Sequence, residues 1–311
     1  MFEQFVYFIM PFMIIFFGLI GNLLGILTLR KSKQGDSEIG PIHMYRFLFI
    51  TDSINLISFI NEIMDKGYST GIYLYSSFSC KLSFYLSVSF FSLSSLILIY
   101  ILIESYLSIK YPVESNLLRK NRPQFIYLII IFIINLIYFS PLISGYNIIS
   151  INNSTSNLAC AIESNKNEIS VLMFINRILL PLILIIFFSA ILIYKIITTK
   201  ERMNIFYSKR ERIRFKKDVH LSFISILFNL IQYSFNIPFI CVIFISNDTH
   251  SPVFFFCLNI FVLSFAFNFY FLLLVNSLFR RDFFSFFTNK SPRNMSNVEM
   301  EIIHQRNLIF L

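Results

Sequence analysis

Charged residues are scarce in this chain of 311 residues. They make up 14% of it, whereas a soluble domain typically carries about 25%. Hydrophobic residues make up 56%, and the mean hydropathy is +0.69. A soluble protein this apolar could not cover its surface with polar groups, so the sequence predicts a protein that lies in a membrane. The same composition argues against a disordered chain, a disulfide-rich secreted domain and a nucleic-acid-binding protein, despite the net charge of +9.

Catalytic motifs are also missing. The sequence contains no phosphate-binding loop and no nucleophile motif. His43, His220, His250 and His304 are scattered among different loops and helix ends, so we expect no metal cluster. No internal repeat is found, which counts against a transporter built from duplicated halves. We therefore expect neither an enzyme nor a duplicated carrier.

Long apolar stretches make up most of the sequence. Seven of them are long enough to cross a bilayer as helices, which takes about 20 residues each. Membrane-spanning strands are excluded, because they are only about ten residues long and alternate polar with apolar residues. The predicted spans are residues 5–29, 42–64, 82–109, 125–146, 171–197, 219–245 and 252–279. The sequence thus predicts an all-α membrane protein, a bundle of seven transmembrane helices whose first span is retained rather than cleaved as a signal peptide.

Basic residues are concentrated in the loops after spans one, three and five and in the segment after span seven. Because such loops face the cytoplasm, the N-terminus is predicted outside and the C-terminus inside. Two interpretations of the very basic loop between spans five and six stay open. Its charge either serves only to orient the protein in the membrane, or it also binds anionic lipid or a cytoplasmic partner. Glycosylation sequons at Asn152, Asn153 and Asn247 fall in the predicted outer loops, in agreement with the orientation.

The four cysteines allow three pairings. Cys80 lies at the outer start of span three, and Cys160 lies in the longest outer loop. Both face an oxidising compartment, so a disulfide between them is the pairing with a supporting context. Cys241 and Cys257 are interpreted as free apolar residues.

Polar residues and prolines follow a particular order along the spans. In chain order they are Gly21-Asn22, Asp52, Glu104-Ser105-Tyr106 with Pro112, Pro181, Pro238, and Asn268-Phe269-Tyr270. Together with seven spans and a cysteine that starts the third, this order resembles the rhodopsin-like G-protein-coupled receptors. The resemblance covers about residues 18–287 and implies the fold of that family, with a receptor domain over residues 1–287.

The sequence departs from the family pattern at three places. Ser105 stands where the family has its motif arginine, and Asn236 stands where a tryptophan is expected. The motif that begins at Asn268 lacks both its proline and its tyrosine. The resemblance is therefore to a divergent member of the family.

Asp52 lies in the middle of span two. A charge there costs about 3 kcal/mol on insertion scales, so we expect Asp52 to face the bundle interior. It is either a structural carboxyl group held by hydrogen bonds or a functional one. The resemblance implies that Asp52, Ser94, Ser264 and Asn268 surround a sodium ion that stabilises the inactive state. No other cofactor is expected.

The resemblance also assigns a coupling role to Glu104, Ser105, Tyr106 and Pro112 at the inner end of span three, and to Asp218 at the base of span six. In relatives, the motif arginine pairs with both carboxylates. Without it, Glu104 and Asp218 need other partners. Two hypotheses remain open: a weak inner lock with high ligand-free activity, or poor coupling to the partner protein.

Span six contains Pro238, which favours a kink. The kink is either static or a hinge for the outward swing that activates the family. Asn229, Gln232 and Asn236 are spaced three and four residues apart, so they share one face. We interpret that face as interior, serving as a pocket floor or, the favoured alternative, in hydrogen bonds between helices.

Several residues near the outer ends of the spans are candidate ligand contacts. They are Glu62, Asp65, Lys81 and Arg177; Ser87 in span three and Gln232 on the polar face of span six are also candidates. The charged ones are alternatively interfacial residues that reach water. The resemblance argues against an amine ligand, because Ser87 stands where amine receptors carry an aspartate, and against retinal, because span seven has no lysine. Residues 157–162 are a candidate strand over the pocket, as in peptide-binding relatives.

The residues that follow span seven have an amphipathic helical pattern. Residues 279–287 place phenylalanines on one face and arginines on the other, which predicts a short amphipathic helix on the inner leaflet. Residues 288–311 are expected to form a flexible cytoplasmic tail.

These observations predict a receptor in the plasma membrane. It binds an extracellular ligand, with a neuropeptide favoured, and activates a heterotrimeric G protein by opening its cytoplasmic face. A chemosensory receptor for small molecules and a non-signalling receptor-like protein are the alternatives. A channel or transporter is less favoured, because neither a charged pore nor repeated halves are evident.

Overall fold

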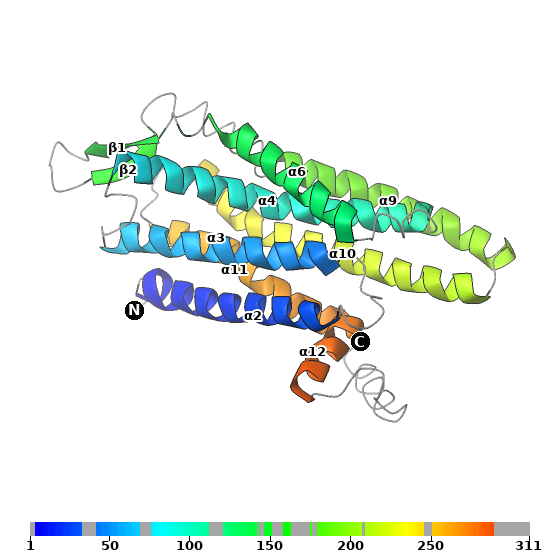
Figure 1. Cartoon of the computed structure of the whole chain (residues 1–311). Helices are drawn as coiled ribbons and strands as arrows, with labels where there is room; N and C mark the ends of the chain where they lie inside the picture. Colours follow the sequence, from blue (N-terminus) through cyan, green and yellow to red (C-terminus); the bar gives the residue numbers. More distant parts are fainter. Residues whose placement is uncertain are drawn as a thin grey trace.

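The computed structural model of the chain describes residues 4–32, 42–68, 76–111, 121–141, 143, 146–150, 158–162, 175, 179–206, 209–245 and 251–288. Long helices lie side by side in one bundle, with a β-hairpin at one end and the short helix α12 at the other (Figure 1). We refer to these as the hairpin end and the α12 end of the bundle.

Seven long helices form the described bundle, one for each predicted span. They are α2 (Met10–Ser32), α3 (Ile42–Tyr68), α4 (Ser77–Lys110), α6 (Asn121–Phe139), α9 (Leu180–Phe206), α10 (Lys209–Ile245) and α11 (Pro252–Val275). A π-helical turn, η1 (Phe5–Ile9), runs directly into α2. Five of the described helical segments are long and apolar enough to cross a membrane, and α6 contributes a shorter apolar one.

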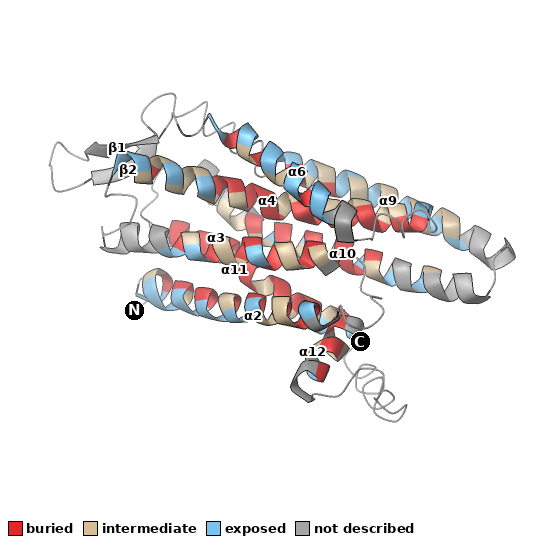
Figure 2. Cartoon of the chain, in the orientation of Figure 1, coloured by how far each residue is buried: buried red, intermediate tan, exposed pale blue. Residues whose placement is uncertain are grey.

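Burial follows the expectation for helices surrounded by lipid. Buried residues lie on the sides that face neighbouring helices, whereas outward sides are exposed (Figure 2). On α6 the outward side carries isoleucines such as Ile130, Ile133 and Ile134, which are about half exposed. Exposed apolar side chains over so much of a helix are compatible with hydrocarbon as the surrounding solvent.

Two predicted spans end elsewhere than expected. Span four was predicted to reach Tyr146, but α6 ends at Phe139, because Pro141 disfavours helical backbone at the residue before it. Span seven was predicted to reach Phe279, but α11 ends at Val275 and Asn276 interrupts the helix. The Asn276 side-chain oxygen accepts a 3.1 Å hydrogen bond from the Phe279 backbone N–H and so caps α12 (Ser277–Thr288).

A two-stranded antiparallel β-hairpin lies between α6 and α9 in the chain. It consists of β1 (Tyr146–Ser150) and β2 (Leu158–Ile162), with Ile148 opposite Cys160. The predicted strand at residues 157–162 is confirmed, whereas β1, which begins where span four was predicted to end, was not predicted. Cys80 is disulfide-bonded, and Cys241 and Cys257 are free, as predicted for the last two. The side chain of Cys160 lies outside the described residues, so its pairing with Cys80 stays a prediction.

The core divides into two main apolar clusters along the bundle. One fills the hairpin-end half and includes Leu56, Phe91 and Phe265. The other fills the α12-end half and includes Phe49 and Phe228. Asp52 lies on α3 between Phe49 and Leu56, and therefore between the two clusters.

A glycine allows α2 to pack closely on its neighbours. A Cβ atom at Gly18 would lie 2.6 Å from the Leu56 side chain and 2.7 Å from the Ala266 Cβ. Such distances exclude any larger residue without movement of a helix. Gly18 therefore sets the approach of α2 to α3 and α11 beside the centre of the bundle.

Candidate functional site: a polar centre between two aromatic cores

Asp52 joins three helices at the middle of the bundle. Its side chain is fully buried. The Ser94 hydroxyl of α4 donates a 2.6 Å hydrogen bond to Asp52 Oδ1, and the Asn268 amide of α11 donates one of 2.5 Å to Asp52 Oδ2. The structure thus brings together three of the four residues predicted as sodium ligands. We call Asp52, Ser94 and Asn268 the polar centre.

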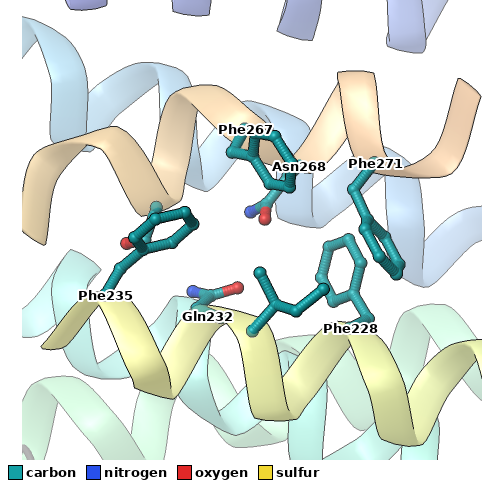
Figure 3. Close-up of a pocket in the computed structure, with 8 residues that line it drawn as sticks. Phe228, Gln232, Phe235, Phe267, Asn268 and Phe271 are labelled. Carbon is teal, nitrogen blue, oxygen red and sulfur yellow. The ribbon is translucent and has the colours of Figure 1, made fainter. Parts of the chain in front are cut away.

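Ser264, the fourth predicted ligand, lies beside this centre without contacting Asp52. It is buried on α11 one turn before Asn268, and its hydroxyl donates to the Phe261 carbonyl oxygen at 2.7 Å. Ser264 and Asn268 line a narrow gap between α10 and α11 together with Gln232. In Figure 3 the amides of Gln232 and Asn268 point into this gap from facing helices. The gap has no volume that a water molecule could occupy.

The side chains at the centre suit a small hard cation. A carboxylate, hydroxyl groups and amide oxygens are the ligands that such ions prefer. The described residues contain no group of three or more histidines, cysteines and acidic residues, as a transition-metal site would require. Gln232 Oε1 is buried in the gap and has no hydrogen-bond partner among the described residues, so this oxygen can still accept a hydrogen bond. In the described arrangement, protein donors satisfy both Asp52 oxygens.

The amide face of α10 points inward, as predicted. Asn229, Gln232 and Asn236 are all buried, with exposed fractions of 0%, 4% and 9%. The Asn229 amide donates to the Ser225 carbonyl oxygen of the same helix, at 2.8 Å. The side-chain oxygens of all three have no hydrogen-bond partner within the described part of the chain. The favoured prediction of hydrogen bonds between helices is therefore not met in this arrangement, and Gln232 lies beside the polar centre rather than at an outer ligand contact.

Glu104 and Ser105 are buried near the α12 end of α4, with exposed fractions of 3% and 8%. The Glu104 carboxylate interacts electrostatically with Tyr45 of α3 and Tyr100 of α4. Tyr106 is partly buried and packs on an apolar cluster shared by α4, α9 and α10. Glu104 thus lies in the electrostatic surroundings of two tyrosines, one on each of α3 and α4.

Tyr45 and Ser225 connect α3 to α10 close to Glu104. The Ser225 hydroxyl donates to the Leu221 carbonyl oxygen at 3.0 Å, so its oxygen is left to accept from the neighbouring Tyr45 hydroxyl, and both side chains are buried. The Tyr45 ring also meets the Phe228 ring edge-on, with 6.4 Å between centroids. The sequence analysis missed this link, although a signal existed: Ser225 lies four residues before Asn229 on the same helical face.

The interior at the hairpin end is aromatic. The Phe91 ring of α4 lies 5.3 Å from Phe261 and 5.1 Å from Phe265, both on α11. The Phe239 ring of α10 stacks on Phe261 at 5.0 Å. The η1 turn covers this cluster, since the Asn259 amide of α11 donates to the Val6 carbonyl oxygen at 2.8 Å.

Other predicted site residues divide into two groups. Lys81 and Ser87 are partly buried on α4 toward the hairpin end. Several others lie outside the described residues: Pro112, Asn152, Asn153, Arg177 and Asn247, together with the side chains of Glu62, Asp65 and Asp218. The predicted tail at 289–311 also lies outside them.

A comparison with known families decides the identity of this fold. The model of the seven-transmembrane receptor family, rhodopsin family, matches residues 21–271, well over half of the chain. The chain belongs to the rhodopsin family of seven-transmembrane receptors. The family consists of receptors rather than enzymes, and the apolar helices agree with a multi-pass membrane protein.

One curated relative of this receptor-family chain is galanin receptor 2b of Danio rerio. The two are 24% identical over 233 residues, which is 75% of this chain. The match covers 61% of the relative, so the chain spans less than two thirds of that receptor's length.

Proposed function

We propose that this chain is a G-protein-coupled receptor of the plasma membrane whose ligand is an extracellular peptide. The observation that carries the proposal is the polar centre, which links α3, α4 and α11 between the two aromatic cores. A buried centre at this place lets a change in the hairpin-end half alter helix packing in the α12-end half. The family match supports a receptor that uses this coupling to signal.

The orientation follows from charge. Lys110 ends α4, Lys195 and Lys200 lie in the last part of α9, and α12 carries Arg280 and Arg281. These basic residues belong to the α12 end, and positive charge accumulates on the cytoplasmic side of membrane proteins. The α12 end therefore faces the G protein and the hairpin end faces the ligand. Sequons at Asn152, Asn153 and Asn247 would then carry glycans outside the cell.

A peptide ligand is favoured by two observations. The relative is named as a galanin receptor, and β2 forms the strand predicted over the pocket. The phenylalanines in the hairpin-end half of the bundle would take an apolar or aromatic side chain of such a peptide. Predicted charged contacts at Glu62, Asp65 and Arg177 would hold its polar parts at the rim. A chemosensory ligand is the competing outcome.

We assign a small monovalent cation, with sodium as the test ion, to the polar centre. Asp52 would supply the negative charge, with oxygens of Ser94, Ser264 and Asn268 around it. A bound cation would offset the free-energy cost of a buried carboxylate and hold the three helices together. It would therefore favour the closed, inactive arrangement.

Activation would open the α12 end by moving α10 away from α3. That movement must break the Tyr45–Ser225 hydrogen bond. A hydrogen bond between two neutral hydroxyls is weaker than the arginine–carboxylate pairs that lock relatives. This arrangement supports the hypothesis of a weak inner lock over that of poor coupling.

The proposal is tested by G-protein activation in cells that express the full chain. A library of neuropeptides is applied, and surface expression is measured in the same cells. We expect a concentration-dependent response to at least one peptide above a raised ligand-free level. Silence toward all peptides, with ligand-free activation intact, would point to a chemosensory ligand. Silence in both conditions at normal surface expression would contradict the receptor function.

A further inference from the structure

The first described turn of the chain packs into the half of the bundle that we assign to the ligand. Turn η1 lies at the hairpin end, where it runs into α2 (Figure 1). Val6 is fully buried and belongs to the apolar cluster that contains Phe91 and Phe261. The Tyr7 ring lies 4.5 Å from the Phe255 ring of α11, measured between centroids. Turn η1 therefore adds a wall to the cluster that would take the apolar side chain of a peptide.

A proline leaves one carbonyl group of this turn in need of a partner from outside it. Within a helix, the Val6 carbonyl oxygen would accept a hydrogen bond from the N–H of residue 10 or residue 11. The Met10 N–H is donated to the Phe5 carbonyl oxygen, and Pro11 has no N–H. Neither helical donor therefore serves the Val6 carbonyl, which must find a donor elsewhere because it is buried.

The Asn259 amide of α11 supplies the missing donor. It donates a 2.8 Å hydrogen bond to the Val6 carbonyl oxygen. Asn259 is itself fully buried, and its side-chain oxygen has no hydrogen-bond partner among the described residues. Closing η1 on α11 thus satisfies one buried polar pair but keeps one acceptor away from water. Opening would return that acceptor to water, so the closed turn is held more weakly than a fully satisfied contact would hold it.

We propose that η1 is a displaceable lid on the peptide site, latched shut by Asn259, and that a bound peptide displaces it. The inference rests on the proposed peptide ligand. The lid and an apolar peptide side chain would compete for the same cluster, because Val6 already fills part of it. A closed lid lowers the apparent peptide affinity by the fraction of molecules that are open, so a weaker latch raises that affinity.

The experiment measures how often the lid opens in the purified full chain in lipid nanodiscs. Val6→Cys places a small apolar thiol at the buried position, where a water-soluble maleimide reaches it only when η1 opens. Mass spectrometry of the labelled segment separates this thiol from the native cysteines. The rate of labelling at position 6 is therefore a direct readout of the lid.

Labelling is timed for Val6→Cys alone and in combination with Asn259→Leu, Pro11→Ala or Tyr270→Phe. Tyr270→Phe is the matched control. The Tyr270 hydroxyl also joins α11 to a backbone carbonyl oxygen of α2, that of Phe17, at 2.9 Å, but it does not touch η1. Loss of that bond should leave the labelling rate at the value for Val6→Cys alone.

We expect Asn259→Leu to speed labelling about fivefold or more, the change that loss of one hydrogen bond produces. Pro11→Ala should also speed labelling, by another route. It restores an N–H at residue 11, so the turn can close as an ordinary α-helix and the Asn259 amide loses its acceptor. Pro11→Ala completes a helical turn, so misfolding does not account for this result. The two changes together should add little, because both remove one bond.

The part of the peptide is tested with the neuropeptide library of the activation assay. Peptides that activate the chain should speed labelling at position 6, whereas inactive peptides should not. In cells that express the chain without Val6→Cys, Asn259→Leu should lower the half-maximal concentration of each active peptide about fivefold. Tyr270→Phe should leave that concentration unchanged.

Three results would overturn the inference, and they are distinguishable. Equal labelling with and without Asn259→Leu and Pro11→Ala would show that no latch exists. Active peptides that change neither the labelling nor its dependence on Asn259 would show that η1 is no lid, while the receptor function stands. If no peptide activates the chain, the peptide ligand of the proposed function fails and a lid for it fails too, even where Asn259→Leu speeds labelling.

Discussion

At the scale of single residues, the structure is organised around one buried carboxylate. Asp52 would be costly in the middle of a membrane helix, yet Ser94 and Asn268 each donate a hydrogen bond to one of its oxygens. Those donors lie on different helices, so satisfying the charge also fixes the packing of α3, α4 and α11. The same contacts that stabilise the closed bundle are those a moving bundle must rearrange.

Replacing Ser94 with alanine should destabilise the chain. Hydrogen bonds to charged groups are worth about 1.5–3 kcal/mol, and Asp52 Oδ1 would lose its donor. Thermal or denaturant unfolding in detergent measures the change. Ser87→Ala is the control, because Ser87 lies on the same helix, is only partly buried and makes no contact with Asp52; it should shift stability by less than about 0.5 kcal/mol. Equal effects of the two variants would show that the Ser94–Asp52 bond contributes nothing specific.

At the scale of helices, two junctions hold the α12 end of the bundle together. Tyr45 and Ser225 link α3 to α10 where a motif arginine is missing. Asn276 separates α11 from α12, and Phe269 of α11 packs against Phe279 of α12 with 5.9 Å between ring centroids. Both junctions lie toward the α12 end, so both control the surface that we assign to the G protein.

Removal of the Tyr45 hydroxyl should increase ligand-free signalling. Tyr45→Phe loses a hydrogen bond worth about 1 kcal/mol while it keeps the ring against Phe228. That free energy corresponds to a rise of about fivefold in the open population. G-protein activation per receptor at the cell surface is the readout. Tyr270→Phe serves as the control, since its hydroxyl bonds to the Phe17 carbonyl oxygen between α11 and α2.

The same link can be checked by a double-mutant cycle. Ser225→Ala should raise the ligand-free activity as Tyr45→Phe does, and the double variant should add little more, because both remove one bond. Additive effects would mean that the two hydroxyls act independently and that no such lock exists.

Loss of the Asn276 cap should loosen α12. Asn276→Ala leaves the Phe279 backbone N–H without its acceptor, a change that costs about 1 kcal/mol at a helix N-terminus. Hydrogen exchange of the α12 backbone amides should become about fivefold faster, since exchange follows the local free energy of opening. Ser277→Ala, at the exposed neighbouring position, should leave the exchange unchanged. Unchanged exchange in Asn276→Ala would show that packing alone holds α12.

At the scale of the whole molecule, much of the architecture could be predicted from the sequence. Apolar length located all seven helices, and the resemblance to the family correctly brought Ser94 and Asn268 to Asp52. Strand β1 is too short to predict from pattern alone, because Tyr146–Ser150 has only five residues and its pairing partner lies beyond a loop.

Contacts between distant segments were the part that sequence could not supply. The Tyr45–Ser225 link depends on how α3 and α10 face one another, and no spacing rule relates them. The sequence left open whether the face of Gln232 serves as a pocket floor or bonds to another helix, whereas the packing of α10 on α11 places Gln232 in a gap with Ser264 and Asn268. Periodicity predicted the buried face correctly, but the neighbour of that face follows only from the fold.

The most direct test of the account is nucleotide exchange on heterotrimeric G proteins by the purified full chain in lipid nanodiscs. The account predicts exchange above the level of empty nanodiscs without any ligand, because the link at Tyr45 is weak. It predicts that sodium lowers this exchange relative to choline at equal ionic strength, since the cation closes the bundle. Absence of exchange across the G-protein classes, for a chain shown to be folded by its thermal transition, would contradict the account.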